Sequence, residues 1–125
     1  MNSKLLFIVL SLFLSSNKIF AQSEAELEKL SIFSEYVKSK NYDAAFVPWM
    51  ELRTTTPKLN KAIYIFGERI LKNKISTSEG DEKVKFLLDL LKLWEERSIN
   101  FPKITPKGAY LAKASQLNYD NKKLL

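Results

Sequence analysis

The chain has 125 residues, a length that fits a single domain. It contains no Cys and no His, which excludes disulfide frameworks, zinc sites with thiolate or imidazole ligands, Cys nucleophiles and His-based catalytic triads. Three Gly are too few for a Gly-rich phosphate-binding loop. We therefore expect no catalytic residues, no cofactor and no metal site.

Residues 1–21 have the three-part layout of a secretory signal peptide. Lys4 makes the start positive, residues 5–14 form an apolar run, and Ala21 is a small residue directly before Gln22. We predict cleavage between Ala21 and Gln22, and export to the periplasm or the cell exterior. An uncleaved membrane anchor is the alternative, but a spanning helix needs about 20 mainly apolar residues. No later segment is long and apolar enough to span a membrane.

The positive charge of the chain is confined to its two ends. The formal net charge is +6, and the two lysines of residues 1–21 account for part of it. Positive and negative side chains cancel over residues 22–102, whereas residues 103–125 hold five Lys against one Asp. Because the body is neutral, nucleic-acid binding is not expected. The basic C-terminal segment is interpreted as a solvated face, with contact to an anionic envelope surface or an acidic partner as the alternative.

Apolar residues recur at helical spacing in five segments, and no strand pattern is present. We predict an all-α fold with helices over residues 24–40, 43–53, 57–74, 81–97 and 107–117. Ser23, Asp81 and Thr105 are predicted N-caps, and Pro57 is predicted at the first position of the third helix. A loop is expected over residues 75–80.

Large apolar residues on these helices define a candidate core. Trp49 is expected there with Ala45 and Leu52, and Pro48 is expected to kink their helix. On the fourth helix one apolar stripe is predicted, widened by further apolar residues beside it. The stripe comprises Val84, Leu87, Leu88, Leu91 and Trp94, and the residues that widen it are Phe86, Leu90 and Leu93.

Two pairs of adjacent acids, at residues 81–82 and 95–96, are the only candidates for acid–base chemistry. Neighbouring side chains on a helix point about 100° apart, so two such carboxylates do not face one substrate. Both pairs are therefore interpreted as solvated surface.

A Trp and a Pro eight residues apart occur twice, 45 residues from each other: Trp49 with Pro57, and Trp94 with Pro102. Helix pairs that recur at a fixed period are typical of solenoid proteins.

The first unit of this repeat resembles the tetratricopeptide repeat (TPR) family. Its aromatic, small, large-apolar and proline positions are matched by Ile32, Tyr36, Tyr42, Ala45, Trp49 and Pro57. Phe33 and Leu52 stand where the family has small residues, and Lys40 stands where it has a turn Gly. The resemblance implies a TPR-like array over residues 22–125, with two helical hairpins stacked in a right-handed sense and a fifth helix.

The same resemblance implies that the chain binds protein segments and catalyses nothing by itself. We therefore expect protein–protein interaction or scaffolding in the cell envelope. The alternative is a small, non-repetitive periplasmic chaperone or envelope-associated factor. The fifth helix has no second helix after it, and we expect its apolar side to dock on a partner, a second copy or residues missing from a longer relative. The apolar residues concerned are Tyr110, Leu111, Leu117, Leu124 and Leu125. A solvated terminal cap is the alternative.

Overall fold

A computed structural model describes residues 24–125, which form five α-helices and no strand. The first helix spans residues 24–38. It is followed by α2 (Tyr42–Thr55), α3 (Ala62–Thr77), α4 (Gly80–Asn100) and α5 (Lys107–Asp120). The predicted all-α class is confirmed. The predicted signal peptide, the Ala21–Gln22 cleavage site and the Ser23 cap lie outside the described residues.

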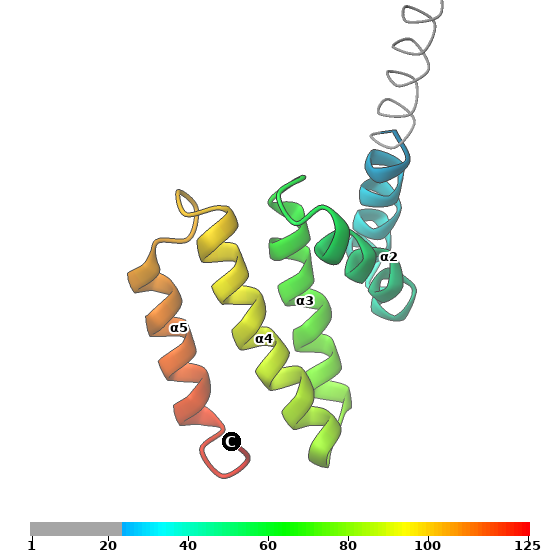
Figure 1. Ribbon diagram of the computed structural model, residues 1–125. Coiled ribbons are helices and arrows are strands. Elements are labelled where there is room, and N and C mark those ends of the chain that lie inside the picture. Colours follow the sequence, from blue (N-terminus) through cyan, green and yellow to red (C-terminus); the bar gives the residue numbers. More distant parts are fainter. Residues whose placement is uncertain (1–23) are drawn as a thin grey trace, which may run out of the picture.

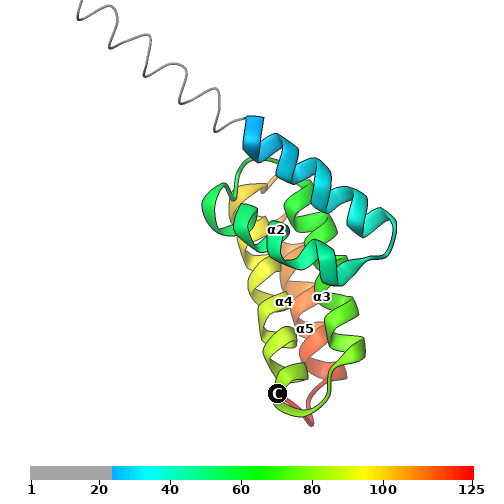
Figure 2. The same ribbon diagram turned by 90° about the vertical axis from the view of Figure 1, so that its right-hand side faces the viewer.

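The helices form a row with a hairpin across one end (Figure 1). α3, α4 and α5 lie side by side, and the first helix and α2 lie beyond α3. Seen from the side, the first helix and α2 run across the upper part of α3 and α4 (Figure 2). The first helix and α5 are therefore at opposite ends of the molecule. No helix of the described chain has the length and hydropathy needed to cross a membrane.

Trp49 lies at the centre of the core, as predicted. Its side chain has no exposed surface, and its Nε1 donates a hydrogen bond of 2.7 Å to the backbone oxygen of Ile63 on α3. Gly67 faces the indole, and a Cβ added there would lie 2.5 Å from Trp49 Nε1. The close approach of α2 to α3 therefore requires Gly67. Trp94 on α4 is also buried, as predicted.

The third helix does not begin where the sequence predicts. It starts at Ala62, because residues before it form a turn in which Leu59 N donates to Thr56 O. The Tyr64 hydroxyl donates to the carbonyl of Pro57 at 2.9 Å and holds this turn against α3. The expectation that Pro57 opens the helix is wrong, because that side-chain contact keeps the proline outside it.

Two predicted N-caps are wrong as well. The first residue of α4 is Gly80, so Asp81 lies inside the first turn, and no side chain caps the helix. Thr105 does not cap α5; its hydroxyl is buried and has no hydrogen-bond partner among the described residues. Both α3 and α4 run further than predicted, so the expected loop over residues 75–80 is reduced to Ser78 and Glu79.

Some predicted core positions are exposed. Leu88 is 53% exposed, because α4 turns Leu87, Leu90, Leu93 and Trp94 inward instead. On the first helix, Ile32 and Tyr36 are exposed and Phe33 occupies the core. Ile32 and Tyr36, which match the large-apolar and aromatic positions of the TPR resemblance, are therefore not part of the core.

The ends of the helices repeat the 45-residue offset of the two Trp–Pro pairs. The residue after α2, Thr56, has φ −137° and ψ 60°, and its N–H donates to the carbonyl four residues earlier. The residue after α4, Phe101, has φ −134° and ψ 64° and makes the same bond. α3 and α5 begin at residues 62 and 107, which are also 45 apart.

Candidate functional site: a groove between α2 and α4

An apolar groove runs between α2 and α4. A cavity of about 630 Å³ lies between the two helices, and it adjoins a cavity of about 370 Å³ that is lined by α2 alone. The two cavities share Phe46 and Met50. Val47 of α2 and Leu88 of α4 line the groove and are among the exposed large apolar side chains of the chain. Exposed apolar surface inside a concave site is typical of a binding surface.

Aromatic contacts fix the floor of the groove. The ring of Phe46 meets Phe86 edge-on at 6.4 Å and Trp49 at 5.7 Å between ring centroids. Lys74 Nζ lies 5.5 Å from the centre of the Phe46 ring and pairs with Asp43 at 2.5 Å. The Phe46 ring is therefore held against α3 by Lys74 and against α4 by Phe86.

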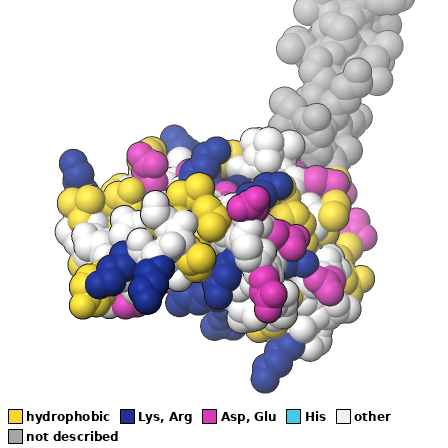
Figure 3. Space-filling view, turned by 90° about the horizontal axis from the view of Figure 1, so that it is seen from below, with side chains coloured by type: hydrophobic (Ala, Val, Ile, Leu, Met, Phe, Trp, Pro, Cys, Tyr) yellow, Lys and Arg dark blue, Asp and Glu magenta, His cyan; other side chains and the backbone are white. Residues whose placement is uncertain are grey.

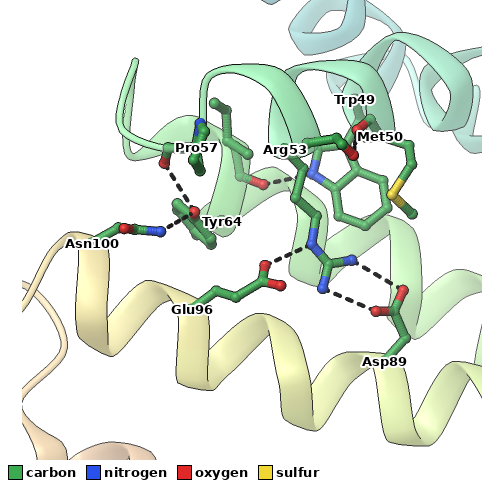
Figure 4. A network of polar contacts seen from close by, with 10 residues as sticks. Trp49, Met50, Arg53, Pro57, Tyr64, Asp89, Glu96 and Asn100 are labelled. Carbon is green, nitrogen blue, oxygen red and sulfur yellow. Dashed lines mark hydrogen bonds and ion pairs between the residues drawn. The ribbon is translucent and has the colours of Figure 1, made fainter.

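A charged network closes one end of the groove (Figure 4). Arg53 of α2 binds both oxygens of Asp89 at 2.9 and 3.0 Å, and its Nε donates to Glu96 at 2.8 Å. The guanidinium also lies 5.3 Å from the centre of the Trp49 ring. These contacts join α2 to α4. Beside them is a third cavity of about 410 Å³, which shares Met50 with the apolar part.

Opposing effects act on Arg53, whose side chain is only 6% exposed. Burial lowers the pKa of the guanidinium, but hydrogen bonds and charge attraction from Asp89 and Glu96 outweigh burial and raise it. Arg53 is therefore a permanent cation with both carboxylates as counter-ions.

Tyr64 lies behind the network and joins three segments. Its hydroxyl accepts a hydrogen bond of 2.7 Å from Asn100 Nδ2 and donates to Pro57 O, as Figure 4 shows. Burial raises the pKa of the phenol, so it stays neutral and can donate. This pair of bonds ties the α2–α3 turn to the end of α4.

A second charged cluster joins α3 to α5. Glu68 accepts a hydrogen bond from Trp94 Nε1 at 3.1 Å and pairs with Lys72 at 3.2 Å and Lys113 at 3.6 Å. Burial alone would raise the pKa of Glu68, but the two lysines together with the hydrogen bonds from Lys72 and Trp94 hold it below its ordinary value of 4.5.

This lowered pKa predicts an acid-sensitive contribution to stability. A carboxyl group whose pKa is lower in the folded chain stabilises the fold above its unfolded pKa, and this contribution is lost as pH falls through the folded pKa. Wild type should lose free energy of unfolding as the pH falls from about 5 to about 3, and Lys113→Met should lose less over the same range. Urea unfolding of both proteins across this pH range measures the difference. Lys107→Met, which removes an exposed charge from the same helix, should retain the wild-type profile.

The acid pairs of the sequence do not converge on a catalytic centre. Asp81 and Glu82 are exposed in the first turn of α4. Glu95 is exposed, whereas Glu96 turns toward Arg53, so the two neighbours point apart as predicted. Within residues 24–125, no three Asp, Glu, His or Cys side chains are grouped to hold a metal ion.

The Arg53 network was not predicted from the sequence. Its one sequence signal is the spacing of Asp89 and Glu96, which are seven residues apart and therefore share one face of a helix. Nothing local to Arg53 indicates that it pairs with residues 36 and 43 positions later.

No protein-family model matches the chain, and neither a curated protein nor a solved structure is significantly similar to it. Residues 24–125 can therefore be classified only from their own structure, which is a five-helix, all-α fold with an apolar groove.

Proposed function

We propose that this chain is an exported, TPR-like helical module that binds a segment of another protein in the groove between α2 and α4. The apolar lining of this groove carries the proposal, because Val47 and Leu88 expose their side chains inside a concave surface. Grooves of this kind accept an amphipathic segment that presents apolar anchors at helical spacing.

Two observations support the TPR-like part of the proposal. The 45-residue offset holds for the Trp–Pro pairs, for the ends of α2 and α4, and for the starts of α3 and α5. Lys40 has φ +61°, the left-handed conformation that favours glycine, at the position where the family has its turn Gly. The layout of residues 1–21 supports export.

A photo-crosslinking residue placed in the groove tests the proposal. It is introduced at Leu88 and, as a matched control on the same helix, at the exposed Ile99 outside the groove. Each variant is recovered from the exported fraction of the producing cells. We expect a discrete crosslinked protein band from position 88 that is absent from position 99. The N-terminal sequence of the recovered chain should begin at or near Gln22.

The outcomes separate the proposal from its alternatives. A single crosslinked partner supports a specific interaction module, while many partners that appear only with unfolded clients indicate a chaperone. Equal crosslinking from both positions, or none from either, contradicts a binding role for the groove.

A further inference from the structure

The walls of the α2–α4 groove carry charged as well as apolar side chains. Lys85, Asp89 and Lys92 of α4 line the cavity of about 630 Å³, and Glu51 of α2 lines the adjoining one. Lys85 and Lys92 are both exposed, and they lie seven residues apart on the face of α4 that also presents Leu88. These charges restrict the kind of segment that the groove can hold.

The two acidic side chains of these walls are already paired with cations of the chain. Asp89 binds the guanidinium of Arg53 through both carboxylate oxygens, at 2.9 and 3.0 Å. Glu51 pairs with Lys29 of the first helix. The attraction of both carboxylates for a further cation is therefore reduced.

The two lysines of α4 have no such counter-ion. Within residues 24–125, no carboxylate forms an ion pair with Lys85 or Lys92. At the charged end of the groove, Arg53 is shared between Asp89 and Glu96. Even with this second carboxylate included, positive charge is in excess in the groove and its ion pairs. The cations are Lys29, Arg53, Lys85 and Lys92, and the anions are Glu51, Asp89 and Glu96.

The spacing of the two lysines indicates a ligand that matches them. Seven residues make about two turns of a helix, so two carboxylates seven residues apart on a helix lying along α4 can face Lys85 and Lys92 together. Leu88 lies between the lysines and is 53% exposed, so it can contact apolar side chains placed between the two carboxylates. Val47 of α2, 63% exposed, offers a further apolar contact.

A flat anionic lipid surface fits this site less well than a protein segment does. The lysines border a concave apolar site, whereas binding to a lipid surface needs a broad basic face. On the face seen from below, where α4 begins, lysines and acidic side chains are interspersed (Figure 3). The excess of positive charge is therefore a property of the groove and not of this whole face.

We propose that the segment bound in the α2–α4 groove is an acidic amphipathic helix, whose carboxylates two turns apart pair with Lys85 and Lys92 and whose apolar side chains contact Leu88. This inference rests on the proposed binding role of the groove and adds the chemical class of the partner. Complementary charges at the rim of an interface contribute mainly specificity and a faster association, and salt screens them.

Three synthetic peptides of about 18 residues, a length at which an isolated helix can form, test the proposal. All three carry leucines at helical spacing, and two positions seven residues apart hold Glu, Gln or Lys. Fluorescence anisotropy measures the binding of each labelled peptide to the chain purified from the exported fraction. We expect the Glu peptide to bind about fivefold more tightly than the Gln peptide, and the Lys peptide to bind most weakly. This preference should disappear at about 1 M salt, where the screening length is about 3 Å.

Replacing both lysines separates the charge effect from the apolar contacts. The double variant Lys85→Gln with Lys92→Gln should bind the Glu and Gln peptides equally and should retain the wild-type affinity for the Gln peptide. Lys103→Gln with Lys107→Gln is the matched control, because it removes two exposed lysines outside the groove and should retain the preference. All four positions are exposed, so circular dichroism should show unchanged helix content.

The outcomes distinguish this inference from the proposed function. A photo-crosslinking residue at Leu88 should capture the Glu peptide, and one at Ile99 should not. If Leu88 captures a partner protein but the three peptides bind equally, or none of them binds, the acidic partner is wrong while the binding role of the groove stands. If nothing is captured at Leu88, both are wrong. Displacement of the Glu peptide by vesicles of phosphatidylglycerol would overturn this inference and assign the lysines to a lipid surface.

Discussion

Trp49→Ala is expected to lower the free energy of unfolding by about 3–5 kcal/mol, the usual cost of removing a fully buried tryptophan. Trp49 has no exposed surface and fills the space between α2 and α3. Its loss also removes the hydrogen bond to Ile63 O and one neighbour of Arg53. Since domains of this size have a total stability of about 5–15 kcal/mol, the variant should melt far below wild type. Chemical denaturation followed by circular dichroism measures the difference.

Gly67 provides a second test of the same packing. A Cβ at this position would meet the indole at 2.5–2.7 Å, so Gly67→Ala should cost about 1–3 kcal/mol in the wild-type background. In the Trp49→Ala background the space is open, and the same change should cost little. The exposed control Glu95→Ala should shift stability by no more than about 0.5 kcal/mol. Additive effects of the two core substitutions would show that Trp49 and Gly67 do not contact each other.

The sequence predicts the helices of this chain well, because their apolar spacing is regular. Ala45, Trp49 and Leu52 are buried on one face of α2, as their spacing of four and three residues indicates. Prolines limit the segments, since Pro57 and Pro102 both follow helix ends. These features are local, so they can be read without knowledge of the fold.

The orientation of α4 could not be predicted, because apolar residues surround much of this helix. Leu87 and Leu88 are adjacent and identical, yet Leu87 is buried whereas Leu88 lines the groove. The choice depends on where α2 and α3 pack against α4, which is tertiary information. Leu88 lines the candidate site, so the sequence could not indicate that site for the same reason.

The start of α3 shows how a tertiary contact overrides a local rule. Proline is favoured at the first position of a helix, and Pro57 follows a break in the apolar pattern. In the structure, the Tyr64 hydroxyl binds the Pro57 carbonyl and Asn100 binds the same hydroxyl. The turn is therefore held by the end of α4, and the helix begins five residues later, at Ala62.

Arg53→Met is expected to lower the free energy of unfolding by about 2–3 kcal/mol. Breaking a buried ion pair by removing one partner costs about 3–5 kcal/mol when the other partner is left buried. Here Asp89 and Glu96 remain 26% and 28% exposed, so partial hydration of their carboxylates reduces the cost. Methionine retains much of the apolar stem of arginine, so packing against Trp49 is largely preserved. Urea unfolding of wild type and Arg53→Met at neutral pH measures the loss of stability.

Arg69→Met is the matched control, because Arg69 also lies over an aromatic ring, 5.2 Å from the centre of Phe66, but is exposed. Its replacement should change stability by no more than about 0.5 kcal/mol. Adding Asp89→Asn and Glu96→Gln to Arg53→Met should restore part of the lost stability, because the two uncompensated carboxylates are then removed. If Arg53→Met and Arg69→Met lose the same small amount, Arg53 does not fasten α2 to α4. The charged end of the groove would then be held in place by the apolar contacts of Trp49 and Met50 alone.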